Sequence, residues 1–383
     1  MKKVTVVTAT RAEYGILKPL IGRLKAEKDI ETQLVVTGTH LSEKYGNTQQ
    51  EIIEDGNEID RRIPILEEGN LPCDISVTMA NATRGFAVYF AEEKPDVLIV
   101  LGDRTEMLGV CAAAVNERIP IAHLHGGELT EGAVDDCIRH AITKMSYLHF
   151  PATEVYRRRI IQMGEAPERV YDVGALGVEN ILKTPLLSYE DMCAQTGVPQ
   201  SRKYVVVTFH PVTLERGTTA EQVEELLDAM ARQSQYFYLV TKANADAGGE
   251  LVNRMFADFA GKQENVALVA SLGMKRYLSA VKYSEFVLGN SSSGIIEAPA
   301  LGIPTVNIGD RQKGRIMAQT VICCPAESGA IEAAMRQAQQ TEHRVSDLYG
   351  DGETSEKIVR ILKDFLRQEK KDLKKEFYDL GVV

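Results

Sequence analysis

Short runs rich in β-branched residues alternate with longer helical patterns along this chain, and that alternation limits the possible folds more than any other feature. It is typical of parallel α/β sheets, in which a helix carries the chain from each strand to the next. The expected strands of the first half cover residues 4–8, 33–37, 97–101, 121–124 and 147–150. Those of the second half cover residues 204–209, 236–241, 266–269, 286–288 and 305–308. The sequence therefore predicts an α/β protein with two series of parallel strands.

A glycine-punctuated segment, residues 172–179, separates the two series. Gly174 and Gly177 interrupt the pattern there, which makes this segment the expected hinge between two domains. The length of 383 residues is enough for about two to three domains with cores of their own. Near the end of the chain, apolar residues recur with helical spacing at positions 358, 361, 362, 365 and 366. One amphipathic helix is expected there, followed by a charged tail.

The charge balance is acidic, with 44 Lys and Arg against 54 Asp and Glu and a formal net charge of −10. It argues against a nucleic-acid partner, because phosphate neutralisation needs clustered cations. No apolar stretch approaches the roughly 20 residues that cross a bilayer, so no membrane partner is expected. Arg11 and Glu13 interrupt the apolar N-terminus before it resembles a signal peptide. Six cysteines without C-x-x-C spacing indicate reduced thiols, and we therefore expect a soluble, cytoplasmic protein.

Polar and charged residues gather directly after the expected strands. Each one alone could belong to an ordinary turn, but open α/β sheets bind ligands outside the carboxyl ends of their strands. We therefore expect one ligand cleft between two facing sheets. The residues concerned are Thr10, Arg11, Thr39, His40, Asp103, Arg104, His123, His125, Glu128, His210, Asn244, Ser271, Asn290, Ser291, Ser292, Ser293 and Arg311.

Residues 290–294 read Asn-Ser-Ser-Ser-Gly and lead from a strand into an expected helix. Hydroxyls and free backbone N–H groups at a helix N-terminus suit a phosphate, although a plain serine N-cap has the same pattern. Cations that could reach the same ligand are Arg11, Arg104, Arg311, Lys313 and Arg315. Since arginine pairs phosphate oxygens through two parallel hydrogen bonds, this group predicts a diphosphate site on an otherwise acidic protein.

The common motifs for nucleotide cofactors and metals are missing. No G-x-G-x-x-G follows the first strand and no Walker G-x-x-x-x-G-K-[ST] occurs, which argues against NAD and P-loop chemistry. His123 and His125 stand two residues apart at a strand end and lack the H-E-x-x-H spacing of zinc enzymes. We therefore expect neither a metal nor any other cofactor.

Residues 123–140 are the part of the chain richest in titratable groups. In the helix expected there, Asp135 can pair with Arg139 four residues later. Asp136 can pair with His140 in the same way. Such pairs also stabilise helices without any further role, and we expect one of the two to be structural.

Glu128 belongs to the same segment, Asp103 follows the preceding strand, and His210 follows the first strand of the second series. Together with the helix they bring carboxylates and imidazoles to the expected cleft. Opposed groups of these kinds are what an elimination or hydrolysis at C1 and C2 of a sugar needs.

Seven motifs occur in a characteristic order along nearly the whole chain. They are T-R-A-E-Y-G at 10–15, T-G-T-H at 37–40, L-G-D-R at 101–104, H-G-G-E at 125–128 with D-D-C-I-R-H at 135–140, H-P-V at 210–212, G-N-S-S-S-G at 289–294 and G-D-R-Q-K-G-R at 309–315. With them the chain resembles the hydrolysing UDP-N-acetylglucosamine 2-epimerases of sialic acid biosynthesis. The resemblance implies a GT-B-like fold, with two Rossmann-like domains whose parallel sheets face a central cleft.

The resemblance also implies how the domains divide the work. The first domain, residues 1–174, would hold the sugar and would be completed by the C-terminal helix, 355–383. The second domain, residues 175–354, would bind UDP. Members of the family commonly form homodimers or homotetramers, and the same is expected here.

Site residues follow from the motifs that match. Catalytic positions around the sugar are Asp103, Glu128, Asp135 and His210, with His40 close by. Positions at or near the diphosphate are Arg11, Arg104, Ser291, Ser292 and Arg311, with Arg315 on the same loop. On the nucleotide side, Glu297 would hold the ribose hydroxyls, Asn244 would line the site, and the backbone near Ser271 and Leu272 would contact uracil. Related epimerases often carry a carboxylate at the position of His125, so the proton transfer at that position is open.

The expected chemistry can be argued from the substrate. The C2 proton of an N-acetylglucosaminyl group is next to no carbonyl carbon, so loss of UDP must accompany or precede its removal. Arginines and a helix N-terminus stabilise the leaving diphosphate, while carboxylates take the proton. Water then adds to the resulting 2-acetamidoglucal and gives N-acetylmannosamine, without a metal or redox cofactor. Asp103 and Asp135, before Glu128, are expected to divide the acid and base roles.

Other functions are compatible with the same residues. The substrate could be a UDP- or GDP-linked N,N′-diacetylbacillosamine used for legionaminic acid. A non-hydrolysing epimerase fits the motifs at 10–15 and 125–128 less well. A GT-B glycosyltransferase would share the UDP site but needs an acceptor and leaves C2 unchanged. A noncatalytic nucleotide-sugar sensor would not need so many titratable residues at strand ends.

Overall fold

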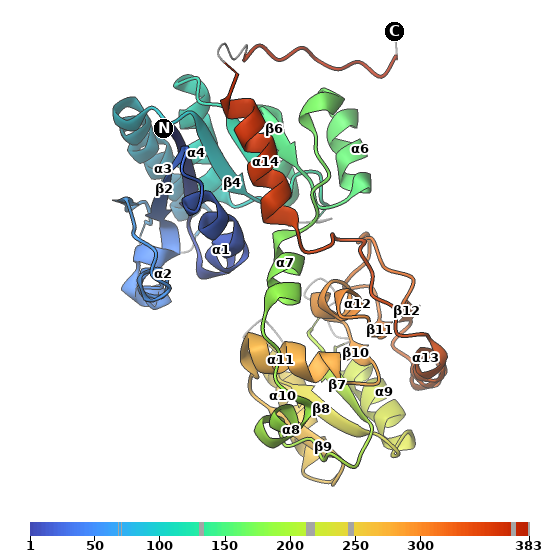
Figure 1. The fold of residues 1–383 in the computed structure, drawn as a ribbon. Coiled ribbons are helices and arrows are strands. Elements are labelled where there is room, and N and C mark those ends of the chain that lie inside the picture. Colours follow the sequence, from blue (N-terminus) through green and yellow to red (C-terminus); the bar gives the residue numbers. More distant parts are fainter. Residues whose placement is uncertain are drawn as a thin grey trace. The chain divides into compact units, whose positions relative to one another are not determined.

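The computed structural model describes residues 1–67, 69, 71–129, 134–211, 219–243, 249–368 and 373–381 (Figure 1). Two compact units divide the chain. Unit 1 contains residues 1–180 and 350–383, and unit 2 contains residues 181–349. The domain limits inferred from the sequence, 174/175 and 354/355, stay predictions, as does the cleft between the domains.

Unit 1 is built on a six-stranded parallel sheet with the order β3-β2-β1-β4-β5-β6. Its strands are β1 (Lys2–Thr8), β2 (Ile30–Thr37), β3 (Arg61–Ile63), β4 (Val97–Leu101), β5 (Ile121–Leu124) and β6 (Leu148–Phe150). The order 3-2-1-4-5-6 is that of the Rossmann fold, in which ligands lie beyond the carboxyl ends of the central strands. The predicted α/β class with Rossmann-like units is therefore confirmed for this half.

Unit 2 repeats the arrangement with the order β12-β11-β10-β7-β8-β9. Its strands are β7 (Tyr204–Thr208), β8 (Phe237–Thr241), β9 (Val266–Val269), β10 (Val287–Gly289), β11 (Thr305–Ile308) and β12 (Val321–Cys324). Since every neighbouring pair is parallel and the first strand again lies centrally, unit 2 is a second Rossmann-like sheet.

All ten strands expected from the sequence are present, but two edge strands, β3 and β12, were not predicted. β3 has three residues and begins with Arg61 and Arg62, both exposed, so it lacks the apolar run that marks a central strand. β12 is only partly buried. Short or charged edge strands are common because they prevent further strands from pairing with the sheet.

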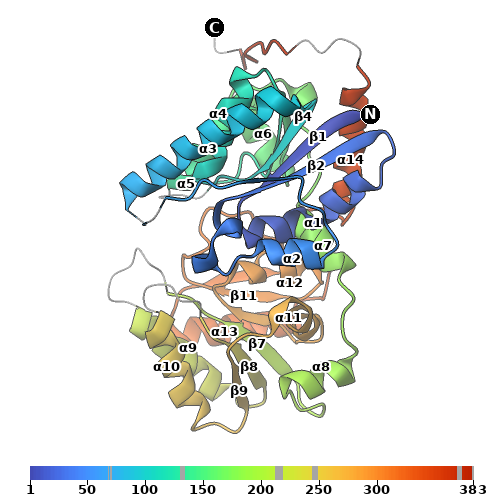
Figure 2. The same ribbon diagram turned by 90° about the vertical axis from the view of Figure 1, so that its left-hand side faces the viewer.

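Helices cover both faces of the sheet in unit 1. They are α1 (Arg11–Lys25), α2 (Gln49–Glu54), α3 (Pro72–Glu93), α4 (Thr105–Asn116), α5 (Val134–Met145), α6 (Glu154–Gln162), α7 (Leu176–Lys183, which runs into unit 2) and α14 (Thr354–Leu366). Val4 and Val6 of β1 pack toward α1 and α14, whereas Val7 packs toward α3 and α4. Figure 2 shows α3 and α4 on one side of this sheet and α14 on the other.

The predicted amphipathic helix near the C-terminus is α14, and it belongs to unit 1. Ile358, Leu362, Phe365 and Leu366 are buried against α1 and the first sheet, and Ile361 is partly buried. The amphipathic helix is confirmed over Thr354–Leu366, where one continuous apolar stripe faces the core. The bounds expected for the C-terminal helix, 355–383, were too long, because residues 373–381 are not helical.

Unit 2 carries its helices in the same way. They are α8 (Tyr189–Thr196), α9 (Thr219–Arg232), α10 (Gly249–Ala260), α11 (Gly273–Lys282), α12 (Glu297–Ala300) and α13 (Ser328–Gln340). Short 3-10 helices at Gly38–Leu41, Glu43–Tyr45, Pro167–Arg169 and Ser292–Gly294 complete the described secondary structure. Within the described ranges, no helix is both long and apolar enough to cross a bilayer.

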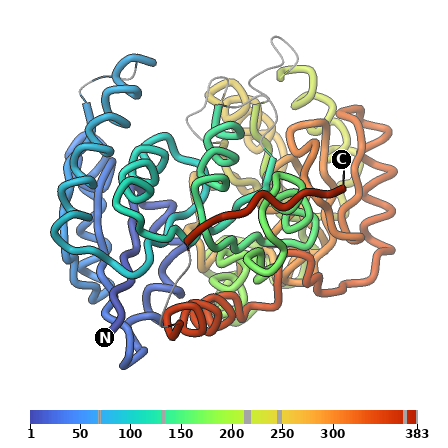
Figure 3. The backbone as a smooth tube through the Cα atoms, turned by 90° about the horizontal axis from the view of Figure 1, so that it is seen from above, coloured from blue at the N-terminus to red at the C-terminus, as the bar shows by residue number. Residues whose placement is uncertain are grey.

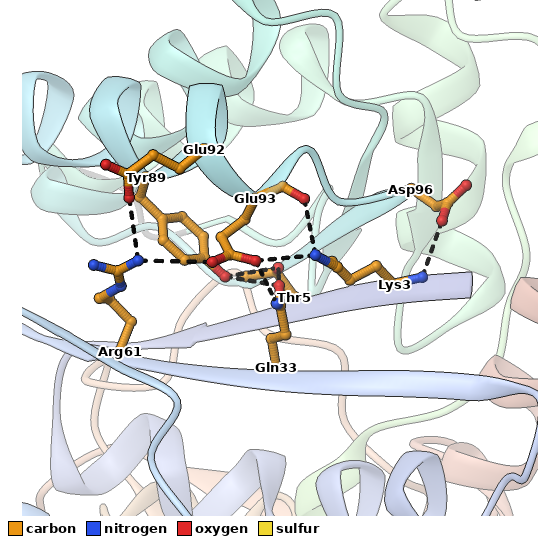
Figure 4. Close-up of polar contacts among 8 residues, drawn as sticks. All are labelled: Lys3, Thr5, Gln33, Arg61, Tyr89, Glu92, Glu93 and Asp96. Carbon is orange, nitrogen blue, oxygen red and sulfur yellow. Dashed lines mark hydrogen bonds and ion pairs between the residues drawn. The ribbon is translucent and has the colours of Figure 1, made fainter. Parts of the chain in front are cut away.

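At the amino ends of the strands of unit 1, polar side chains form what we call the amino-end cluster (Figure 4). Its members are Lys3, Thr5, Gln33, Arg61, Tyr89, Glu92, Glu93 and Asp96. Gln33 Nε2 donates to Glu93 Oε2 at 3.0 Å, and Lys3 Nζ donates to the same oxygen at 3.0 Å. The Tyr89 hydroxyl donates to Gln33 Oε1 at 2.9 Å. The cluster therefore joins strands β1 and β2 to the last turn of α3.

Candidate functional site

The carboxyl ends of β4 and β5 bring the first group of expected site residues together. The two strands pair in parallel with Leu101 opposite Leu124, so the residues that follow them meet at one edge of the sheet. The chain turns sharply at both ends: Gly102 has a φ of +71° and His125 a φ of +60°. Because a left-handed backbone is uncommon for a residue other than glycine, His125 is held there by its surroundings.

Arg139 of α5 is the centre of this group, and its side chain is only 8% exposed. Its Nη2 donates to Asp103 Oδ2, and its Nη1 donates to the His125 carbonyl at 3.1 Å. Glu128 Oε2 lies 3.6 Å from Nη1, and Glu128 Oε1 lies 2.8 Å from His125 Nδ1. We call Asp103, His125, Glu128, Asp135 and Arg139 the carboxyl-edge cluster.

Helical spacing predicted that Arg139 would pair with Asp135, and this pair stays a prediction. The ion pairs of Arg139 with Asp103 and Glu128 lead out of its helix to the sheet edge. A buried guanidinium gains more from two carboxylates at the sheet edge than from one exposed neighbour on its own helix. The second predicted pair is present, with His140 Nε2 3.5 Å from Asp136 Oδ2.

Burial raises the pKa of Asp103 above its usual range, and the neighbouring charges act in both directions. The guanidinium of Arg139 lowers this pKa, whereas the carboxylates of Asp135 and Glu128 raise it. Three carboxylates therefore share the field of one buried guanidinium. A buried carboxyl group with a raised pKa among other charges is typical of catalytic sites.

A hollow of about 1010 Å³ lies in unit 1 in front of the same edge. Asp103, Arg104 and Asp135 line one part of it. Other lining residues come from the segments after β2 and β3 and from the start of α3, and they include Leu41, Tyr45, Pro64, Ile65, Leu66, Ile75 and Thr78. We call Pro64, Ile65, Leu66 and Ile75 the apolar wall. Sequence reasoning missed this wall because it follows β3, the edge strand that was not predicted.

Arg104 lies between acidic groups at the mouth of this hollow. Its Nε donates to Glu106 Oε1 at 2.6 Å, and Glu106 is buried. Glu13 of α1 is also buried, accepts a hydrogen bond from the Ala9 N–H at 3.0 Å, and has a second oxygen without a hydrogen-bond partner among the described residues. Burial raises the pKa of Glu13 to about 7, although the charge of Arg104 lowers it. Glu13 is a site residue that the sequence did not single out.

Arg11 and His40 flank the edge in different ways. The Arg11 side chain is 74% exposed, and its Nε lies 3.6 Å from Glu51 Oε2. His40 is buried, with Nε2 3.1 Å from the Thr8 hydroxyl and Nδ1 2.8 Å from the Thr48 hydroxyl. Burial lowers the pKa of His40 to about 4. Both ring nitrogens are thus occupied within unit 1, and His40 fixes the segment that follows β2.

In unit 2, the expected site residues gather around Asn290 at the carboxyl ends of β7 and β10. The Asn290 side chain accepts from the His210 N–H at 2.7 Å and donates to the His210 carbonyl at 2.8 Å. Arg311 Nη1 and Gln312 Nε2 both donate to the Asn290 carbonyl, at 3.1 and 2.9 Å. The motifs at 210–212, 289–294 and 309–315 therefore meet in space.

The serine-rich turn leads from β10 into short helical segments. Ser291 accepts from the Ser293 N–H at 3.3 Å, one 3-10 turn covers Ser292–Gly294, and α12 has only four residues. Pro299 limits the helix, because it has no N–H to donate to the carbonyl of residue 295. The phosphate site expected at this turn stays a prediction.

Buried polar atoms without partners lie next to this turn. They are Glu297 Oε2 and the hydroxyls of Ser293 and Tyr277, which lie near one another but make no hydrogen bond of good geometry among the described residues. Burial raises the pKa of Glu297, and the neighbouring Ser293 hydroxyl lowers it. Since buried polar groups are nearly always satisfied in a complete protein, unpaired ones of this kind suit the hydroxyls of a ligand.

The remaining expected residues of unit 2 lie at neighbouring strand ends. Ser271 follows β9 and accepts from the Gly273 N–H at 3.2 Å, and Leu272 is buried. Arg315 is exposed, and its charge acts on Glu297. Asn244 lies outside the described residues. In the part of the chain that the structure describes, no three His, Cys, Asp or Glu side chains are grouped to hold a metal ion.

Solved structures show which fold this is. The chain resembles the UDP-GlcNAc 2-epimerase of Neisseria meningitidis, solved with UDP-GlcNAc, with a TM-score of 0.78 and 19% identity over 95% of this chain and 100% of that one. It resembles the UDP-GlcNAc 2-epimerase of Methanocaldococcus jannaschii equally, with a TM-score of 0.78 and 19% identity over 94% and 99%. The protein is therefore a GT-B-like protein with two Rossmann-like sheets, as the sequence predicted.

Sequence relatives identify the family. The pattern that describes the UDP-N-acetylglucosamine 2-epimerase family matches residues 22–363, and the chain belongs to this family. It is 38% identical to the polysialic acid biosynthesis protein P7 of Escherichia coli, over 99% of this chain and 98% of that protein. It is 37% identical to the GDP/UDP-N,N′-diacetylbacillosamine 2-epimerase (hydrolyzing) of Campylobacter jejuni, over 90% and 89%. A UDP-N,N′-diacetylbacillosamine 2-epimerase (hydrolyzing) of Legionella pneumophila is 35% identical over 95% and 96%.

Proposed function

We propose that this protein is a hydrolysing 2-epimerase that converts UDP-N-acetylglucosamine to N-acetylmannosamine and UDP. The carboxyl-edge cluster carries the proposal, because it places Asp103, Glu128 and Asp135 around one buried arginine at the mouth of a hollow. Membership of the 2-epimerase family supports a nucleotide-sugar substrate. The hydrolysing outcome is supported by the names of the relatives from Campylobacter jejuni and Legionella pneumophila.

The reaction divides into an elimination and a hydration. In the first, the C1–O bond to UDP and the C2–H bond break and a C1=C2 double bond forms, which gives 2-acetamidoglucal and UDP. In the second, the oxygen of water adds to C1 and a proton adds to C2 from the opposite face. One of Asp103 and Asp135 removes the C2 proton in the elimination, and the other returns a proton to C2 in the hydration. Two such roles suit these carboxylates, because they interact electrostatically but differ in burial.

We assign the sugar to unit 1 and the nucleotide to unit 2. Arg104 of unit 1, between Glu106 and Glu13, would neutralise diphosphate charge on the sugar side. In unit 2, Glu297 has a buried oxygen without a hydrogen-bond partner among the described residues and suits the ribose hydroxyls. The other residues keep the roles that the motifs imply. Arg11, Ser291, Ser292, Arg311 and Arg315 are assigned to the diphosphate or its neighbourhood, and Asn244, Ser271 and Leu272 to the nucleotide side. His210 is assigned to the sugar with His40 close by, and the proton transfer at His125 stays open.

A second substrate is favoured by two specific observations. The relatives from Campylobacter jejuni and Legionella pneumophila are named for N,N′-diacetylbacillosamine, which has a methyl group at C5 and a second acetamido group at C4. The apolar wall of the hollow would suit those methyl groups better than a hydroxymethyl group. The polysialic acid relative favours N-acetylglucosamine instead, because sialic acid is built from N-acetylmannosamine.

The experiment is a reaction in deuterated water followed by NMR, run in parallel with UDP-N-acetylglucosamine and with UDP-N,N′-diacetylbacillosamine. We expect free UDP and a 2-epimeric reducing sugar that carries deuterium at C2. The substrate with the larger kcat/KM is the one that the pocket selects. An unlabelled sugar product would contradict the elimination, and turnover only after an acceptor is added would assign the protein to the glycosyltransferases.

A further inference from the structure

The last described segment, residues 373–381, contacts unit 1 near the end of α5 and the loop after α6. In Figure 3 it is the dark red trace that passes over green segments of the chain. The Tyr378 N–H donates to the Gly164 carbonyl at 3.0 Å. The Phe377 ring lies over Gly164, where any Cβ would collide with it, and 5.2 Å from Lys144 Nζ. We call this segment the tail.

Lys375 of the tail contacts a group of oxygen atoms, which we call the polar socket: the carbonyls of Lys144 and Ser146 and the carboxylate of Glu165. Its Nζ donates to the carbonyls of Lys144 and Ser146, at 2.8 and 2.7 Å, and lies 2.7 Å from Glu165 Oε2. The Glu165 side chain is fully buried and also contacts Lys144 Nζ at 2.5 Å and His149 Nε2 at 3.0 Å. A buried carboxylate at the bottom of the socket therefore attracts the lysine of the tail.

The two carbonyls that Lys375 meets lie at the C-terminal end of α5, which ends at Met145. The last carbonyls of a helix have no partner within the helix and carry partial negative charge. A lysine ammonium that donates to two of them caps the helix end and fixes its position. Next to α5 the Ser146 hydroxyl donates to the Ile142 carbonyl at 2.7 Å, and the tail adds Lys375 as a further donor to the carbonyls at this end.

The other end of α5 carries the carboxyl-edge cluster residues Asp135 and Arg139. The helix is 12 residues long, Ile138 and Ile142 pack into the core, and Arg139 bonds to Asp103. A helix moves as a rigid element, so a shift or rotation at Lys144 is passed on to Asp135, about 14 Å away along the axis. Small displacements of catalytic groups are costly in reaction rate.

We propose that Lys375 is a positioning residue of the active site, which holds α5 through its C-terminal carbonyls and Glu165 and so fixes Asp135 and Arg139 against Asp103. The effect of Lys375 on the reaction rate rests on the proposed function. The anchoring of α5 by the tail stands on the contacts alone.

Lys375→Met tests it, with Lys375→Arg as the conservative variant and Glu376→Gln, a neighbouring exposed residue, as the matched control. We expect Lys375→Met to lower kcat by about 10- to 10²-fold while KM changes less than about twofold, because the substrate is still bound but the acid–base groups are displaced. Lys375→Arg should recover most of the rate, and Glu376→Gln should equal the wild type. Hydrogen–deuterium exchange should become faster along the whole of α5, including residues 135–139.

Two results would overturn the proposal. One is a Lys375→Met protein whose melting temperature falls while kcat in the folded protein stays the same. The other is faster exchange confined to the tail itself. If Lys375→Met does not fold, Lys375→Gln keeps hydrogen-bond donors without the charge and the same two readouts apply to it. If the wild type turns over no nucleotide sugar, the proposed function fails, while exchange at 135–139 still decides whether the tail anchors α5.

Discussion

The two ends of the first sheet carry similar polar residues in opposite electrostatic states. In the amino-end cluster (Figure 4), Lys3 Nζ lies 3.0 Å from Glu93 Oε2, and this contact lowers the pKa of Glu93 and raises that of Lys3. At the carboxyl edge, burial instead raises the pKa of Asp103 and brings that of Glu13 to about 7. At the amino end Glu93 and Glu92 have cations of their own, Lys3 and Arg61, whereas at the carboxyl edge Asp103 and Glu128 share the guanidinium of Arg139.

The difference shows which end is built for stability and which for chemistry. A carboxylate that is paired and partly exposed stays ionised and contributes to folding. A carboxyl group that is buried among other carboxylates has a raised pKa, so its ionised form is unfavourable in the folded protein. This lowers the stability of the fold and is typical of functional sites. The amino-end cluster lies mainly on β1, β2 and the end of α3, whereas the carboxyl-edge cluster follows β4 and β5 of the same sheet. The end of the sheet, rather than the residue type, therefore separates the two roles.

Asp103→Asn and Asp96→Asn test the comparison most strongly, because these aspartates stand at opposite ends of β4. We expect Asp103→Asn to lower kcat by roughly 10²- to 10⁴-fold, since it removes a general acid or base. Asp96 accepts from the Lys3 N–H at 2.9 Å and lies at the amino end, so Asp96→Asn should leave kcat unchanged. UDP affinity, measured by calorimetry, should survive in both. An equal loss of turnover and UDP affinity in Asp103→Asn would reassign Asp103 to binding.

Arg139→Met and Arg61→Met compare a buried guanidinium with an exposed one. Arg139 is 8% exposed and holds Asp103, so its loss leaves a buried carboxylate without its cation and should cost about 3–5 kcal/mol in the free energy of unfolding. Arg61 is 44% exposed beside Glu92, and its loss should cost about 0–1 kcal/mol. Urea denaturation measures both values. Similar losses in the two variants would show that the ends of the sheet do not differ in this respect.

Glu13→Gln and Glu93→Gln should change the pH dependence of stability in opposite directions. The folded protein holds the Glu13 proton up to about pH 7, so stability is lost as pH rises from about 4.5 through 7. Glu13→Gln removes this loss and should be more stable than the wild type by up to about 3 kcal/mol at pH 8. Glu93 has a lowered pKa, so its contribution is present at neutral pH and disappears as pH falls.

Thermal unfolding from about pH 3 to pH 8 measures both effects. The stability of Glu93→Gln should lie below that of the wild type at neutral pH and approach it only as pH falls below the ordinary pKa of 4.5, since the pKa of Glu93 is lowered. A Glu13→Gln protein that is less stable than the wild type at pH 8 would show that the Glu13 carboxylate is ionised and paired in the folded protein.

Local pattern was enough to find the central strands and α14. The central strands are buried on both faces of a sheet and read as continuous apolar runs, and α14 is buried along one stripe and reads as apolar residues at helical spacing. Both patterns can be recognised in the sequence alone. The edge strands β3 and β12 escaped because an edge needs no such pattern. The apolar wall behind β3 was missed for the same reason.

Site residues divide in the same way. The motifs located the strand ends where Asp103, Glu128, His210 and Asn290 stand, because ligand-binding residues of parallel sheets follow their strands. Spacing along one helix suggested Asp135 as a partner of Arg139, but it gave no sign of the bond to Asp103, 36 residues away. Glu13 lies in the motif at 10–15, but only its burial in the structure singles it out, and Lys375 is defined by a contact 231 residues distant.

The sequence by itself therefore determined the α/β class, the order of the strands along the chain and the motifs that place this protein among the 2-epimerases. Those depend on short-range periodicity and on residue types at strand ends. Only the tertiary structure decided which charges are matched, which protons are held and which distant lysine caps α5. The reason is physical: pKa values and ion pairs depend on burial and on distances between segments that are remote in sequence.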